Sequence, residues 1–459
     1  MRILLIQASQ ANPVNPEIIQ PMGLLYLGAV LMPLGHEVKL IDMRFHETSL
    51  DRDIKAYNPD VIGISGLTPE AKLIEKVARI SKTAAPKALL VIGGPHATAY
   101  WDRVLDENGA DVAVIGEGEI TFPALIEAWD KGRNFDEIPG VVYRRNGESR
   151  RTDPRPFIED LDAIPMPAWD LMDIEKYFYD ERFVDLRARR EFMAMFTSRG
   201  CPYNCIYCHQ TMGKRYRMRS PENILKEIRY LYDHYDIREI EIEDDSFNLD
   251  RERSMDIFQR IIDSGMDLAV AFRNGVRGDR SDTAFLRKMR EAGTYHIGFG
   301  IEAGTERVQK VIRKNLNIPA VLEAMDYAVQ LGMFTRGFFM LGFPTERREE
   351  IMTTIEVALR SRIHVASFFI VNAFRGTPIY QMAQKMGKTV DIGYDRYDYN
   401  VISHSLCEVP VEELVRMQRT AYMKFYGSPS RIARIIRDVP NKRQIGKYFK
   451  QLVRRMRLA

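Results

Sequence analysis

Cysteine is scarce in this chain, which has only four cysteines among 459 residues. Four thiols are too few for the disulfide framework of a cross-linked secreted protein of this length. Three of them, Cys201, Cys205 and Cys208, fall within one short segment, CPYNCIYC, and the fourth is Cys407. A tight group of thiols in a chain that has almost no others indicates metal binding or redox chemistry.

Long apolar segments are also missing. No apolar run reaches the roughly 18 residues that a membrane-spanning helix needs. The N-terminus MRILLIQAS lacks the basic region, long apolar core and cleavage site of a signal peptide. We therefore expect a cytoplasmic protein. Its hydrophobic fraction of 45% and charged fraction of 28% are typical of a folded chain, and its length predicts two or three domains.

The common nucleotide-binding motifs do not occur. The chain has no GxxxxGKS or GxxxxGKT loop, and its first apolar run leads into QASQANPVNP instead of a GxGxxG turn, so neither a P-loop hydrolase nor a standard dinucleotide site is predicted. Short apolar runs do alternate with amphipathic stretches, which is typical of a parallel sheet covered by helices. These runs lie at residues 3–6, 38–41, 61–65, 89–94 and 112–116.

Glycine-containing motifs follow three of these runs: SGLTPE (65–70), GGPHAT (93–98) and GEGE (116–119). Ligands bind beyond the carboxyl ends of the strands in such sheets. Glycine lets a backbone approach a ligand closely, and a following helix N-terminus favours anionic groups. Each motif alone is also ordinary turn chemistry. Three of them at one edge of a sheet predict a ligand site.

The alternation resumes at about residue 191. Six strand candidates lie at 193–198, 239–243, 268–273, 296–302, 336–344 and 366–372, with a helix expected to begin at Ser220 and Pro221. Six such units predict a partial (β/α)6 barrel of the TIM type. Active sites of these barrels lie at the carboxyl ends of the strands. The cysteine segment falls there, together with Glu243, Asp244, Asp245 and Glu302.

Composition divides the chain into four parts: residues 1–130, a proline-rich connector over 131–190 that contains a short hairpin, the barrel over 191–385, and a helical region over 386–459. Within the last part, VEELVRMQRTAYMKFY is expected to cap the open side of the barrel. From Arg431 onward ten basic residues stand against one acid, Asp438. This basic tail is either a surface for an anionic partner or a solvated helix. The ten are Arg431, Arg434, Arg437, Lys442, Arg443, Lys447, Lys450, Arg454, Arg455 and Arg457.

Three thiolates without a fourth allow two kinds of metal site. A zinc site would need His209 as its fourth ligand, but the adjacent Cys208 and His209 would hardly bind the same tetrahedral ion. A four-iron cluster held by three cysteines instead leaves one iron open. An open position of this kind is where a substrate or cofactor coordinates.

The C-x3-C-x2-C spacing, with an aromatic residue before the last cysteine and a place after the first barrel strand, resembles the radical S-adenosylmethionine (SAM) superfamily. The resemblance implies that Cys201, Cys205 and Cys208 hold a 4Fe–4S cluster, and that reductive cleavage of SAM gives a 5′-deoxyadenosyl radical. Many members have GGE where this chain has EDD, so which carboxylate binds the SAM amine stays open. The implied SAM-binding residues are Tyr207 beside adenine, Glu243, Asp244 and Asp245 at the amine, Glu302 at the ribose, and Gly337, Met340 and Leu341 in the fifth-strand segment GFFMLGFP.

The N-terminal part resembles the Rossmann-like, flavodoxin-type cobalamin-binding domain that precedes the barrel in one large subgroup. GGPHAT, GEGE and PMGLLYLGAVL (21–31) carry this resemblance, and RGTPIY (375–380) resembles the post-barrel motif of the subgroup. The D-x-H-x-x-G signature is absent, so no histidine is expected below cobalt, and His96 is expected in a loop near the corrin. The implied cobalamin-binding residues are Ser65, Leu67, Thr68, Gly93, Gly94, Pro95, His96, Gly116, Glu117, Gly118 and Glu119.

The resemblance implies an enzyme that abstracts a substrate hydrogen and transfers methyl from methylcobalamin to an unactivated centre. The alternatives are an oxidative cyclase or rearrangement enzyme without methyl transfer, and a non-enzymatic cobalamin-binding protein with a zinc knuckle. Methylthiotransferases are disfavoured because no cysteine precedes Cys201. Enzymes with auxiliary clusters are disfavoured because only Cys407 is left over, and it is expected to be a buried apolar residue.

The resemblance also implies partners. A low-potential electron donor such as flavodoxin or ferredoxin would reduce the cluster, and a small-molecule or lipid-like substrate would bind between the cofactors. No nucleic acid is expected. Peripheral membrane contact through the basic tail is a further expectation.

Overall fold

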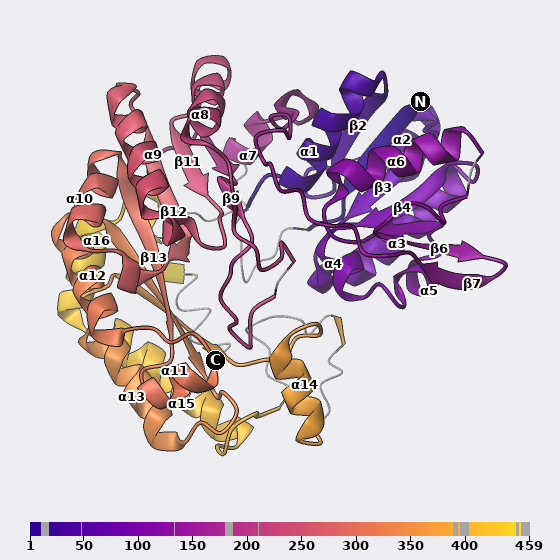
Figure 1. Cartoon of the computed structure of the whole chain (residues 1–459). Helices are drawn as coiled ribbons and strands as arrows, with labels where there is room; N and C mark the ends of the chain where they lie inside the picture. The colour runs from indigo at the N-terminus through magenta and orange to yellow at the C-terminus, as the bar shows by residue number, and fades with distance from the viewer. Residues whose placement is uncertain are drawn as a thin grey trace. The chain divides into compact units, whose positions relative to one another are not determined.

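The computed structural model describes residues 1–10, 18–46, 48–132, 134–179, 187–209, 211–388, 393–394, 404–446 and 449–450. The chain forms two compact units, which are coloured along the sequence in Figure 1. The first unit comprises Met1–Asn12, Ile18–Asp180 and Gly393–Tyr397. The second comprises Pro13–Glu17, Glu181–Ile392 and Asp398–Ala459.

The first unit contains a seven-stranded sheet in the order β2-β1-β3-β4-β5-β6-β7. All five predicted apolar runs form its parallel strands. They are β1 (Arg2–Gln7), β2 (Glu37–Asp42), β3 (Val61–Ser65), β4 (Leu89–Gly93) and β5 (Val112–Val114). The hairpin of the connector, β6 (Val141–Arg145) and β7 (Glu148–Arg151), pairs antiparallel with β5 and extends this sheet.

Both faces of the first sheet are buried at its inner strands β1, β3, β4 and β5. Alternate residues of β1 enter different apolar cores, with Leu4 and Ile6 on one face and Ile3 and Leu5 on the other. This two-sided burial explains why the strands read as continuous apolar runs. The covering helices are α1 (Met22–Leu31), α2 (Leu50–Tyr57), α3 (Ala71–Ala84), α4 (Gly94–Ala99), α5 (Val104–Asn108) and α6 (Gly118–Asp130).

The second unit contains six parallel strands in the order β15-β14-β13-β12-β11-β8. They are β8 (Phe192–Met195), β11 (Glu239–Ile242), β12 (Ala269–Val276), β13 (Thr294–Glu302), β14 (Phe334–Leu341) and β15 (Val365–Ile370). Because β8 and β15 lie at opposite edges of this sheet, the predicted partial barrel is confirmed. Helices α8 (Pro221–Tyr235), α9 (Arg251–Asp263), α10 (Thr283–Glu291) and α12 (Ile318–Gln330) line its outer side in Figure 1.

Helix α8 begins as the sequence predicts. The Ser220 hydroxyl accepts a hydrogen bond from the Asn223 amide at 3.2 Å, and Pro221 occupies the first turn, where its missing N–H costs nothing. The helix buries Ile224, Ile228 and Leu231.

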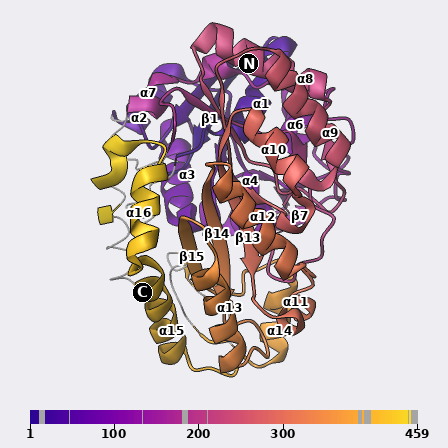
Figure 2. The ribbon, with the colours of Figure 1, turned by 90° about the vertical axis from the view of Figure 1, so that its left-hand side faces the viewer.

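The free edge of β15 is covered by a helix instead of a strand. Figure 2 shows α15 (Val411–Tyr426) and α16 (Pro429–Asp438) on this side of the second unit. The Tyr426 hydroxyl accepts from the Ala366 amide (3.1 Å) and donates to its carbonyl (3.0 Å). The Tyr422 hydroxyl accepts from the Phe368 amide at 3.0 Å, and Gln418 donates to the Phe368 carbonyl at 2.7 Å. Side chains four residues apart on one helix face therefore satisfy the backbone groups of an edge strand.

The first residues of the basic tail make contacts within the second unit. Arg431 is 4% exposed, and its guanidinium donates to the carbonyls of Leu359 and Ser361 at the end of α13 (Arg348–Arg360). Asp438 lies 3.0 Å from the ring of His364. Residues 447–448 and 451–459 of the tail lie outside the described residues. Among the described helices, none has the length and apolar character needed to span a membrane.

The covered edge gives a stability prediction. Replacing Tyr422 or Tyr426 with Phe leaves buried backbone groups of β15 without partners, so each change should lower the free energy of unfolding by about 1–2 kcal/mol. Urea unfolding of each variant measures the loss. Met423→Ala on the exposed face of the same helix is the control and should change stability little. Phe variants as stable as the wild type would contradict the prediction.

Candidate active site

The cysteine loop leaves the barrel through a tight turn. Strand β9 (Ser198–Arg199) pairs antiparallel with β10 (Arg217–Met218), and the loop between them carries the cysteines. Gly200 has φ +82°, and a Cβ there would collide with the Arg215 carbonyl oxygen. The amide of Cys201 then donates to the Gly213 carbonyl at 3.2 Å. The turn therefore requires glycine directly before the first cysteine.

Ile206 anchors the middle of the loop. Its side chain is 1% exposed and packs in an apolar cluster. The cluster includes residues at or just beyond the carboxyl ends of three barrel strands, namely Ala303, Met340, Phe343 and Val371. Helix α14 (Pro378–Lys385) contributes Ile379. Its amide donates to the Ile312 carbonyl (3.1 Å), and its carbonyl accepts from the Ile379 amide (2.9 Å). Ile379 belongs to RGTPIY, so the post-barrel motif holds the cysteine loop in place.

The three thiols of the loop are free and differ in exposure: Cys201 is half-buried, Cys205 is buried and Cys208 is exposed. The pKa of Cys205 lies above its ordinary value, because burial outweighs the lowering effects of Lys314 and of a hydrogen bond with Tyr207. As thiolates, all three repel one another. Soft sulfur ligands and a need for neutralising cations fit an iron–sulfur cluster.

The environment of His209 differs from that of the thiols. Its ring stacks on Phe374 with 5.5 Å between ring centroids. Within the described ranges, no three His, Cys, Asp or Glu side chains are gathered closely enough to hold a single metal ion.

The acidic segment after β11 divides into different roles. Asp244 is 2% exposed and accepts from the Thr197 amide (2.6 Å) and the hydroxyls of Thr197 (2.5 Å) and Ser198 (2.6 Å). Asp245 is exposed, accepts from the Gly200 amide and interacts electrostatically with Cys201 and Cys208. Asp244 therefore braces the strand that leads into the loop, and Asp245 is the carboxylate beside the cysteines.

Glu243 continues the backbone pairing of β11. Its amide donates to the Met195 carbonyl at 3.0 Å.

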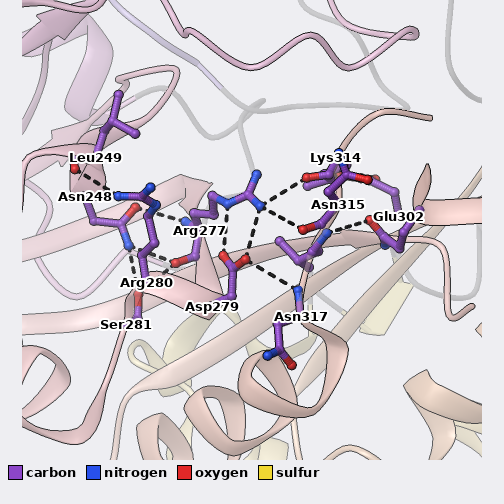
Figure 3. Close-up of polar contacts among 12 residues, drawn as sticks. Asn248, Leu249, Arg277, Asp279, Arg280, Ser281, Glu302, Lys314, Asn315 and Asn317 are labelled. Carbon is purple, nitrogen blue, oxygen red and sulfur yellow. Dashed lines mark hydrogen bonds and ion pairs between the residues drawn. The ribbon is translucent and has the colours of Figure 1, made fainter. Parts of the chain in front are cut away.

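Glu302 ends β13 in a left-handed conformation, with φ +65°. Its carboxylate forms an ion pair with the Lys314 ammonium at 2.9 Å, shown in Figure 3. Both residues interact electrostatically with Cys205. The structure thus brings the predicted ribose residue to the predicted cluster loop.

The residues predicted near adenine lie at different depths. The Tyr207 ring lies 5.5 Å from that of Phe343, and Met340 belongs to the apolar cluster around Ile206. Leu341 is fully buried. Gly337 lies in the middle of β14, where a Cβ would meet Ile363 and Phe339. Their contact with SAM stays a prediction.

Sequence reasoning missed Glu346, in the turn after β14. This fully buried carboxylate accepts from the amides of Gly342 (2.7 Å) and Phe343 (2.9 Å), which fixes the turn that presents Phe343 to Tyr207. Arg277, Asp279 and Lys314 were missed as well. Arg277 and Asp279 follow β12 and Glu346 follows β14, so only their place after an apolar run could have indicated them. Lys314 follows α11 (Glu306–Val311) and carries no such signal.

The three motifs of the first unit interlock at the carboxyl edge of its sheet. Gly94 has φ +83° and a Cβ there would strike the Ser65 hydroxyl. The His96 amide donates to the Gly66 carbonyl at 3.3 Å, and the Gly116 amide donates to the Thr98 hydroxyl at 3.0 Å. The ends of β3, β4 and β5 therefore form one continuous edge.

This edge suits a large flat ligand. Leu67 is 53% exposed there, an unusual position for an apolar side chain. Gly116 has φ +81°, and a Cβ there would stand in open space. An exposed apolar side chain beside open backbone fits a corrin ring.

The remaining predicted cobalamin residues have local roles at the same edge. Thr68 is 8% exposed, and Gly93 ends β4. Glu117 accepts from the Ile158 amide at 2.7 Å. Pro95 lies in the first turn of α4, and Gly118 and Glu119 lie in that of α6.

The expectation that His96 lies in a loop is wrong. It belongs to α4 and is fully buried, with its ring centroid 5.2 Å from that of Tyr100 and 5.3 Å from that of Tyr394. Burial and the neighbouring Arg103 lower the pKa of His96 to about 4, so the imidazole is neutral at physiological pH. The glycine pair before it made GGPHAT look like a turn, but Gly94 begins a helix.

Comparison with known proteins finds a different family match in each of the two units. Residues 15–126 match the B12 binding domain, and residues 195–358 match the radical SAM superfamily. An uncharacterized methyltransferase of Pyrococcus horikoshii is 33% identical over 89% of this chain and 88% of its own length. Cytidylyl-2-hydroxyethylphosphonate methyltransferase of Streptomyces wedmorensis is 29% identical over 81% and 79%. Anaerobic magnesium-protoporphyrin IX monomethyl ester cyclase of Rubrivivax gelatinosus is 26% identical over 83% and 69%.

A solved structure shows the same fold. The cobalamin-dependent S-adenosylmethionine radical enzyme OxsB, with aqua-cobalamin and SAM bound, has a TM-score of 0.76 at 17% identity and covers 99% of this chain and 71% of that one. The chain therefore belongs to the B12-binding radical SAM enzymes. The cofactors predicted from the sequence, namely cobalamin, SAM and a 4Fe–4S cluster, are confirmed as those of this enzyme.

The cysteine loop predicts a selective loss of iron. Serine at Cys201, Cys205 or Cys208 removes one of three cluster ligands, so each variant should reconstitute with little iron and sulfide. Cys407→Ser is the control, because Cys407 lies in a separate hydrogen-bonded turn with Ser405 and Val409. Iron analysis after anaerobic reconstitution measures the effect. Full iron binding by any of the three loop variants would contradict the assignment.

Replacement of the two neighbouring aspartates should cause different defects. Asp244→Asn forces an amide NH2 toward donors, so the free energy of unfolding should fall by about 2 kcal/mol. Asp245→Asn changes an exposed residue and should alter stability by less than about 0.5 kcal/mol. If Asp245 is the carboxylate that receives the SAM amine, which the resemblance implies for this segment, the change should weaken SAM binding. Urea unfolding and SAM titration separate the two. The reverse pattern would show that the roles are exchanged.

Glu346 predicts a pH dependence. Burial raises its pKa from an ordinary value of 4.5 to about 7. Between these values the unfolded chain has lost the proton that the folded chain retains, so stability falls as pH rises, by up to roughly 3 kcal/mol. Glu346→Gln removes this contribution. Its stability relative to the wild type should therefore be higher at about pH 8 than at about pH 5, and an equal difference at both pH values would refute the prediction.

Proposed function

We propose that this enzyme is a methyltransferase that acts on an unactivated centre of a small organic substrate. The observation that carries the proposal is the joint presence of a three-thiol loop on a radical SAM barrel and a B12-binding domain in one chain. The two relatives with the highest identities given above are both called methyltransferases, which supports the same conclusion.

The chain's own residues hold and orient the cofactors. Cys201, Cys205 and Cys208 bind the cluster, Asp245 receives the SAM amine, and Glu302 receives the ribose hydroxyls. Asp245 is favoured over Asp244 because Asp244 already accepts three hydrogen bonds within the protein. Together the bound cofactors supply a hydrogen-abstracting radical and a transferable methyl group.

Cobalamin binding is assigned to the carboxyl edge of the first sheet. The backbone of Gly93, Gly94 and Gly116 and the side chain of Leu67 would line the corrin. His96 is held away as a neutral, buried group and does not ligate cobalt in this proposal.

The two candidate reactions consume SAM differently. A methyltransferase uses SAM both as methyl donor and as radical source, so anaerobic protein with cobalamin, SAM and a low-potential reductant should form S-adenosylhomocysteine together with 5′-deoxyadenosine. Both products are measured by mass spectrometry, and Cys208→Ser should abolish 5′-deoxyadenosine.

The oxidative cyclase alternative is favoured by one observation, the 26% identity to a cyclase over 83% of this chain. A cyclase would form 5′-deoxyadenosine without S-adenosylhomocysteine. That outcome, with cobalamin bound, would overturn methyl transfer and leave the radical chemistry intact.

We further propose a cytoplasmic enzyme that takes its electron from a flavodoxin or ferredoxin and uses the basic tail to contact anionic membrane surfaces that hold a lipid-like substrate. The excess of basic residues after Asp438 supports this contact. Deletion of residues 440–459 should then reduce sedimentation with anionic vesicles. Unchanged sedimentation would remove the membrane part of the proposal.

A further inference from the structure

Arg277 is the first residue after β12, at the carboxyl end of the barrel. Its backbone is held on both sides by one buried side chain, Asn248, which accepts from the Arg277 amide (3.1 Å) and donates to its carbonyl (2.8 Å). Asn248 also donates to the Ser281 hydroxyl at 2.9 Å. Figure 3 shows this bracket, which gives the Arg277 side chain a fixed base.

The guanidinium of Arg277 contacts three separate segments. It forms a two-point ion pair with Asp279, with Nε at 2.9 Å and Nη2 at 3.1 Å from the carboxylate oxygens. It donates to the backbone carbonyls of Lys314 (3.1 Å) and Asn315 (3.4 Å). Its central carbon lies 4.0 Å from the centre of the Tyr203 ring, in the cysteine loop. A planar cation suits all three contacts at once.

The turn that Arg277 holds has an unusual backbone. Arg313 and Asn315 both adopt left-handed conformations, with φ +57° and +51°. Non-glycine residues persist there only where the surroundings hold them. The Gln309 carbonyl accepts from the amides of Lys314 and Asn315, and the Arg277 guanidinium binds their carbonyls. Between these contacts, Lys314 is directed at Glu302.

The same turn also touches the cysteine loop directly. The Ile206 amide donates to the Ile312 carbonyl at 3.1 Å. With Tyr203 beneath Arg277, the loop is tied to the turn at two points on either side of Cys205. A connected path therefore runs from the cluster loop through Arg277 and Lys314 to Glu302, and Figure 3 shows its polar part.

We propose that Arg277 is a positioning residue that fixes the cluster loop and the Glu302 carboxylate in one frame, so that SAM bound at the cluster meets its ribose partner. The inference rests on the radical SAM assignment and is independent of methyl transfer. Arg277 touches neither reacting atoms nor, in this proposal, SAM itself.

Arg277→Lys tests the proposal, because lysine keeps the charge and loses the planar contacts. Iron content should stay at the wild-type level, since the three cysteines remain. SAM affinity should fall about tenfold, the loss expected for one charge-assisted contact. The change that SAM causes in the electron paramagnetic resonance spectrum of the reduced cluster should be diminished. Hydrogen exchange should quicken in both 201–208 and 312–317.

Arg280→Lys is the matched control. Arg280 lies three residues away and is exposed, and its guanidinium donates to the Leu249 carbonyl at 3.4 Å (Figure 3). It should bind SAM and respond spectroscopically as the wild type does. A defect equal to that of Arg277→Lys would show a general sensitivity of this turn and overturn the specific role.

A second variant separates positioning from an unpaired charge. Arg277→Met combined with Asp279→Asn removes both partners of the ion pair and should show the same SAM defect with iron retained. If this double variant binds SAM normally, a poorly paired Asp279 carboxylate explains the defect of Arg277→Lys and the proposal fails. Normal SAM affinity and a normal spectrum in Arg277→Lys would also refute it, as would loss of iron and of folded structure in both variants. All these measurements stop at cofactor binding, so a cyclase or methyltransferase outcome leaves them unaffected.

Discussion

The burial of Ile206 is the constraint on which the active-site end of the second unit depends. A loop that presents three thiols cannot build its own core, because its side chains must face a cofactor. This loop places one apolar side chain into a cluster shared by the ends of β13, β14 and β15 and by α14. This contact fixes the backbone of the loop, and so the cysteines on either side of Ile206, relative to the barrel strands. The post-barrel motif joins the same cluster through Ile379, which explains how a distant segment serves the metal site.

The sequence predicts the strands and the cysteine loop because each depends on a pattern of neighbouring residues. The inner parallel strands of the first sheet are continuous apolar runs, since both of their faces are buried. The cysteine spacing and the strand before it place the cluster loop. The same reasoning was insufficient for His96, because GG followed by proline is equally typical of a turn and of a helix start.

Environment, in contrast, comes from contacts between distant segments. Asp244 and Asp245 are neighbours with identical side chains, yet one is buried against Thr197 and the other lies beside the thiols. Nothing in EDD distinguishes them, because the difference arises from the strand that packs next to β11. Arg277 and Glu346 were missed for the same reason. Arg277 contacts the cysteine loop and Glu346 binds backbone amides. Neither contact can be recognised from the residues next to Arg277 or Glu346 in the sequence.

The helix along the edge of β15 has a consequence for synthesis of the chain. Ala366 and Phe368 are translated about 50 to 60 residues before Tyr422 and Tyr426, which satisfy their backbone groups. Until α15 leaves the ribosome, the nascent barrel exposes a strand edge able to pair with another chain. Completion of the barrel is therefore a late event. Cluster insertion needs the loop together with β13, β14, β15 and α14, which hold Ile206. All of these precede α15 in the chain, so insertion can come before the step that protects the barrel edge from aggregation.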